Sequence, residues 1–108
     1  MNVPNQKDAQ PPPGDREVTL FRLYVADETP NSNRSRANLQ SIGKEHLQDR
    51  YRTEVVDILQ YPLRALSDGI LVTPTLVRLS PLPVRTIVGD LSDVTAVLLA
   101  LGLAGSTE

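Results

Sequence analysis

The sequence contains no cysteine, and this absence excludes several kinds of chemistry at once. Thiol–disulfide exchange, thiolate nucleophiles, thiolate metal ligands and disulfide bridges all depend on that side chain. The chain therefore cannot work as a thiol-based redox enzyme, and its fold cannot rely on disulfides for stability.

Histidine is almost as scarce, because His46 is the single one in the chain. A metal site would have to combine it with Glu45 or Asp49 on a solvated helix, so we expect a partly exposed helix histidine and no metal. Asp27 and Glu28 are read as turn and capping residues rather than a catalytic pair. The six glycines are scattered singly and form no phosphate-binding loop. We expect no catalytic residue, no cofactor and no enzyme activity.

Long hydrophobic runs are also missing. No apolar stretch approaches the roughly 18 residues that span a bilayer, and the first residues lack the apolar core of a signal peptide. Eleven Lys and Arg against thirteen Asp and Glu leave a net charge of -2, which supplies no broad attraction to nucleic acid or anionic membrane. We therefore expect a cytoplasmic protein that binds neither.

The 108 residues fit one compact domain between two polar ends. Residues 1–17 hold four of the nine prolines and show no apolar periodicity, so they predict a disordered tail. Residues 104–108 are small and polar and are expected to fray. The folded domain is therefore predicted to span residues 18–103.

The first half of this domain predicts a strand, a helix and a second strand. Residues 18–26 are apolar on both faces, as in a strand that is covered on two sides. Thr29 can cap the helix with Pro30 at its first position, or one of the next two polar residues can cap it one step later. After this helix, residues 53–59 predict another strand. The connection is long enough for a right-handed parallel βαβ unit.

The second half predicts a short helix over residues 62–67, then strands over residues 75–79 and 84–88. Only four residues join these strands, too few for a crossover, so they form an antiparallel hairpin or belong to a less regular arrangement. Ser92 is the predicted N-cap of a last helix, whose apolar residues recur at helical spacing. This is the βαβαββα order of a thioredoxin-like α/β fold, a mixed four-stranded sheet flanked by helices. Pro74 stands where such folds place a cis-proline.

Two stretches resemble one family of proteins. LYVADETPNSNR (residues 23–34) and TPTLVRLSPLPVRTIVGDLS (residues 73–92) closely resemble KaiB, a small cyanobacterial clock protein family, and the related sensor domain of the SasA histidine kinase. The resemblance implies a non-catalytic regulator that docks on the ring-shaped ATPase KaiC in circadian timing, with a KaiA-like protein or a histidine kinase as further partners. It also implies two accessible folds, the thioredoxin-like one and a tetrameric ground state with a rearranged C-terminal half.

Three arginines are the partner-binding candidates. Arg34, Arg78 and Arg85 stand where members of the family commonly carry basic residues, and arginine is favoured at protein interfaces. Arg78 lies on a strand with apolar neighbours, so we expect it to reach solvent or a partner.

Departures from the family pattern leave a second interpretation open. Glu54 and Gly69 replace lysines that contact partners, which suggests instead a diverged thioredoxin-like adaptor in signalling or stress response, outside a clock. Ala100 replaces a glycine in the last helix and favours that helix by about 1 kcal/mol, whereas Gly102, which replaces an aspartate near the helix end, partly offsets this gain. We therefore expect the thioredoxin-like state, as a monomer.

Overall fold

The structure is a computed structural model that describes residues 18–103. The predictions of a disordered tail over residues 1–17 and of fraying over residues 104–108 lie outside the described residues. Between residues 18 and 103, no helix is both long enough and apolar enough to cross a membrane.

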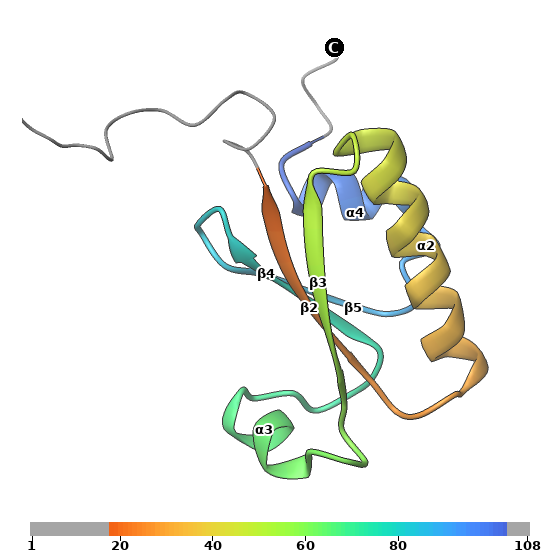
Figure 1. Cartoon of the computed structure of the whole chain (residues 1–108), viewed down its shortest axis with the longest axis vertical. Helices are drawn as coiled ribbons and strands as arrows, with labels where there is room; N and C mark the ends of the chain where they lie inside the picture. Colours follow the sequence, from red (N-terminus) through yellow and green to blue (C-terminus); the bar gives the residue numbers. More distant parts are fainter. Residues whose placement is uncertain (1–17, 104–108) are drawn as a thin grey trace, which may run out of the picture.

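A four-stranded mixed sheet forms the centre of the domain, in the order β3-β2-β4-β5 (Figure 1). The central strand β2 (Thr19–Val25) pairs in parallel with β3 (Tyr51–Asp57) and antiparallel with β4 (Thr75–Ser80). The edge strand β5 (Arg85–Val88) completes the predicted hairpin with β4. The predicted fold class is confirmed.

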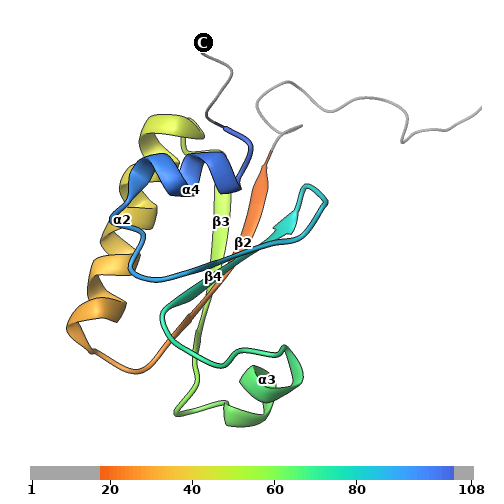
Figure 2. The same ribbon diagram turned by 180° about the vertical axis from the view of Figure 1, so that it is seen from behind.

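The helices lie on both faces of this sheet (Figures 1 and 2). The long helix α2 (Pro30–His46) and the last helix α4 (Val94–Ala100) pack on one face, over Phe21, Leu23 and Val25 of β2. The short helix α3 (Pro62–Ser67) packs on the other face, over Tyr24. Alternate residues of β2 therefore serve two separate cores, which explains why both faces of this strand are apolar.

The start of α2 follows the predicted capping chemistry. The Thr29 hydroxyl accepts a hydrogen bond from the Ser32 backbone N–H at 3.2 Å, and Pro30 occupies the first turn. The Ser32 hydroxyl in turn accepts from the Ala26 backbone N–H at 3.2 Å, which connects the helix to the end of β2. Hydrogen bonds between residues close in the sequence thus stabilise the turn between β2 and α2.

Several details differ from the predictions. β3 begins at Tyr51 and ends at Asp57, two residues earlier at each end than the predicted strand. The predicted N-cap of α4 is wrong by one residue, because Asp93 and not Ser92 accepts from the Ala96 backbone N–H. The Thr73–Pro74 peptide bond is cis, as the fold favours. The peptide bonds before Pro81 and Pro83 are also cis, which the sequence did not indicate.

Candidate docking surface

A depression lies beside the start of α2. It has a volume of about 450 Å³ and is lined by Thr29, Pro30, Arg34 and Thr73. Hydroxyl groups and a guanidinium stand here, and cysteine is absent from the whole chain. The arrangement can bind polar or anionic groups, but it offers no thiol nucleophile.

Arg34 is held at this depression by contacts on both sides. Its side chain is 56% exposed, and its Nε lies 3.2 Å from Asp90 Oδ2. It also donates to the Asn31 side chain. The pKa of Asp90 is lowered because Ser92 donates to its carboxylate from the hydroxyl and the backbone N–H, and because Arg34 donates as well. Asp90 thus stabilises the turn before α4, and it also orients Arg34.

Arg78 does not lie at the surface, and the expectation that it reaches solvent is wrong. Arg78 is only 8% exposed. It pairs with Phe21 of β2, and both residues lie on the face of the sheet that α2 and α4 cover. Its Nη1 donates to the Leu101 carbonyl at 2.8 Å and its Nη2 to the Pro83 carbonyl at 2.9 Å. The side chain therefore ties the end of α4 to the hairpin.

The other candidates do not gather into one patch. Arg85 is exposed on the edge strand β5, opposite Arg78 in the register. His46 is the last residue of α2 and is exposed. Within residues 18–103, no three His, Asp or Glu side chains lie close enough to hold a metal ion. Of the three arginines, Arg34 and Arg85 are accessible to a partner.

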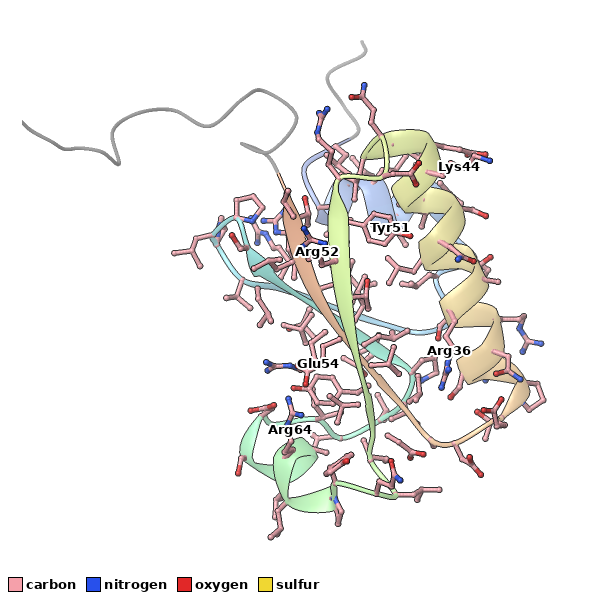
Figure 3. All side chains as sticks on the ribbon, viewed as in Figure 1. Arg36, Lys44, Tyr51, Arg52, Glu54 and Arg64 are labelled. Carbon is pink, nitrogen blue, oxygen red and sulfur yellow. The ribbon has the colours of Figure 1, made fainter. Side chains whose placement is uncertain are left out.

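An ionic network on the α3 face was missed by sequence reasoning. Glu54 Oε1 lies 2.8 Å from Arg22 Nε, and Glu54 Oε2 lies 2.9 Å from Arg64 Nη1. Figure 3 shows Glu54 on β3 and Arg64 on α3 pointing toward one another. The hydrogen bonds from Arg64 and then Arg22 lower the pKa of Glu54 to about 2. The signal that could have found this network is the β2–β3 register, which places Arg22 opposite Glu54.

Tyr24 and Asp68 extend the network to the end of α3. The Tyr24 hydroxyl donates to Asp68 Oδ2, and Arg22 Nη1 lies 3.6 Å from the same oxygen. Burial, and then the hydrogen bond to Asp68, raises the pKa of Tyr24. The phenol therefore stays a neutral hydrogen-bond donor at physiological pH. Glu54 is engaged within the chain, where the resemblance predicts a lysine available to a partner.

An exposed apolar surface surrounds α3. We call it the α3 surface and define it by side chains that are each at least 49% exposed: Leu59, Tyr61, Leu63, Leu66, Leu71 and Val72. Val72 directly precedes Thr73, which lines the depression that holds Arg34. Clustered apolar exposure rimmed by charge is typical of protein interaction sites. The α3 surface and the depression that holds Arg34 are therefore linked along the chain at Val72 and Thr73, and we take the two together as the candidate docking surface.

Comparison with known proteins identifies close relatives. The family model described as the KaiB domain matches residues 22–103. The circadian clock oscillator protein KaiB of Synechococcus elongatus is 47% identical over 88 residues, which cover 82% of this chain and 86% of the relative. KaiB of Microcystis aeruginosa is 46% identical over 88 residues, with 82% and 85% covered.

Solved structures agree with the fold. The N-terminal domain of Synechococcus elongatus SasA superimposes with a TM-score of 0.67 and 25% identity, covering 92% of this chain and 89% of that domain. Mitochondrial thioredoxin 3 of Saccharomyces cerevisiae has a TM-score of 0.60 and 18% identity, with 83% and 80% covered. The second likeness concerns the fold alone.

Proposed function

The chain belongs to the KaiB family, and from this premise we propose that it is a non-catalytic regulatory module that docks on a KaiC-type ring ATPase in circadian or clock-like timing. The observation that carries the proposal is the sequence similarity to KaiB clock proteins, which covers residues 22–103 and so includes the whole candidate docking surface. A KaiA-like protein or a histidine kinase is a further partner under this proposal, and the working form is a monomer.

The α3 surface is the main contact in this proposal. Leu63 and Leu66 are 75% and 71% exposed, and burying each one against a partner would contribute on the order of 1.5–3 kcal/mol. Arg34 adds a charged rim contact that fixes orientation and association rate more than affinity. Arg85 offers a second rim contact on β5. Arg78 supports docking from inside, since it holds the hairpin against α4.

Size-exclusion co-elution of the full chain with a KaiC homologue, in ATP and in ADP, tests the proposal. Leu66→Asp is expected to abolish co-elution, and Arg34→Glu to weaken it at least about tenfold, because a rim charge is reversed. Lys44→Glu is the matched control, since Lys44 is an exposed basic residue near the C-terminal end of α2, away from the α3 surface (Figure 3). Absence of complex in every nucleotide state would overturn the proposal.

A second candidate function is favoured by Glu54. Its carboxylate is held by Arg22 and Arg64, so position 54 offers no positive charge to a partner, where the resemblance predicts a lysine. Such a change fits an adaptor in signalling or stress response that docks on a protein other than a KaiC-type ATPase. Failure of the folded chain to bind a KaiC homologue in any nucleotide state would support this candidate, whereas binding to KaiC that is lost on charge reversal at the exposed Arg34 and Arg85 would count against it.

A further inference from the structure

A cavity of about 520 Å³ lies at the opposite end of the sheet from the α3 surface. The end of α2, the start of β2, the end of β4 and the end of α4 enclose it. Its walls are largely apolar, and the side chains that matter for the argument are Phe21, Leu47, Pro81 and Leu101. This volume is in the range of pockets that bind small molecules.

Basic groups line the same cavity, and no acidic residue does. Arg78, Arg50 and His46 all contribute to its lining. Arg78 is 92% buried, and although both of its Nη atoms donate to carbonyls, its Nε is buried without a hydrogen-bond partner among residues 18–103. No carboxylate in that range forms an ion pair with it. An arginine charge is therefore buried beside an apolar hollow with no counter-ion from the described chain.

Burial of an unpaired guanidinium is costly, and an anionic ligand would remove much of the cost. A carboxylate accepts hydrogen bonds from arginine and supplies the missing charge. The apolar walls formed by Leu47 and Leu101 would in turn cover a hydrocarbon body. We propose that this cavity binds a small organic monocarboxylate with an apolar tail, with the carboxylate directed to the guanidinium of Arg78. The site is separate from the docking surface and does not depend on the proposed function.

NMR titration of the full 108-residue chain with octanoate tests the proposal. Octanoate is expected to shift the Arg78 Nε–Hε resonance together with the amides of Leu47 and Leu101, and to saturate with a dissociation constant on the order of 1 mM or below. Octanol and octylammonium share the tail and lack the negative charge, so each is expected to bind at least about tenfold more weakly. Equal binding of the three probes would overturn the carboxylate assignment, and no saturable shift would overturn the site.

Two variants locate the binding within the fold. Leu47→Trp keeps Arg78 and fills the cavity, so it is expected to weaken octanoate binding at least about tenfold. Leu66→Trp makes the same change on α3, outside the cavity, and is the matched control. Arg78→Gln is expected to abolish binding, but this variant can also unfold because it removes two bonds to carbonyls. If Arg78→Gln unfolds, the Leu47→Trp variant decides the question, because an unchanged affinity for octanoate would show that octanoate does not bind in this cavity.

Discussion

Gly43 has a structural role that the substitution Gly43→Ala, which adds one methyl group, can test. It lies within α2, where glycine lowers helix stability by about 1 kcal/mol relative to alanine. A Cβ atom at this position would lie 2.1 Å from Tyr51 Cε1 and 2.5 Å from Tyr51 Cζ. Figure 3 shows the Tyr51 ring extending from β3 toward α2. The glycine therefore allows the helix backbone to lie directly against the tyrosine ring.

The expected effect of Gly43→Ala is the difference between two opposing terms. Helix propensity favours alanine by about 1 kcal/mol, whereas overpacking a filled site costs about 1–3 kcal/mol. The Tyr51 ring is half-buried and packs edge-on against Phe21 at a centroid distance of 6.3 Å, so it cannot retreat without disturbing the core. We expect the steric term to win, with a net loss of about 1 kcal/mol in the free energy of unfolding.

Urea denaturation of five proteins measures this balance: the parent chain, Gly43→Ala, Ser41→Ala, Tyr51→Ala and the double variant of Gly43→Ala with Tyr51→Ala. Ser41→Ala is the control, because Ser41 is exposed on the same helix and reports the propensity gain without a clash. In a Tyr51→Ala background the clash is gone, so Gly43→Ala should there raise the free energy of unfolding by about 1 kcal/mol. The reasoning is refuted if Gly43→Ala stabilises the parent chain, or if its effect is the same in both backgrounds.

Three further predictions concern single contacts. Glu54→Gln should lower the free energy of unfolding at neutral pH by about 0.5–1 kcal/mol, a value discounted because the carboxylate is 48% exposed. The pKa of Glu54 is lowered from 4.5 to about 2, so its contribution is complete above pH 4.5 and is lost as the pH falls through 2. The difference between parent and variant should therefore shrink across that window in acid denaturation. Asp93→Ala should cost about 1 kcal/mol by thermal melting because it removes the cap of α4; an equal loss in Ser92→Ala would contradict this assignment. Tyr24→Phe should cost about 1 kcal/mol in urea by leaving Asp68 without its phenol donor, and no change would mean that the bond is not formed in solution.

Local patterns were sufficient to predict the order of elements. Strand alternation, the Thr29 cap and the four-residue connection each restrict the chain over a few residues, and together they allow one topology. The ends of the elements were harder to predict, because adjacent residues can both cap a helix. Ser92 and Asp93 are both good caps, and tertiary placement of the turn at Asp90 decides between them.

The location of Arg78 could not be predicted in the same way. The sequence places it on a strand with apolar neighbours, and the usual inference is that so polar a group points outward. The structure turns it inward because the carbonyls of Leu101 and Pro83 come together from distant parts of the chain. These carbonyls accept from the two Nη groups of the buried guanidinium, and only the assembled fold brings them together.

The position of α3, and with it the α3 surface, depends on the ionic network. Helix α3 has six residues, and Ala65 is its one buried residue, so neither intrinsic propensity nor core packing can hold it firmly. Two contacts hold it instead. Arg64 pairs with Glu54 of β3, and Asp68, the residue after the helix, accepts from Tyr24 of β2. Exposed ion pairs are screened by salt, whereas the apolar core is not. Amide hydrogen exchange should therefore accelerate in α3 when salt is raised from about 0.05 M to about 1 M, while α2 is unchanged. Equal protection of α3 at both salt concentrations would show that charge does not hold this helix in place.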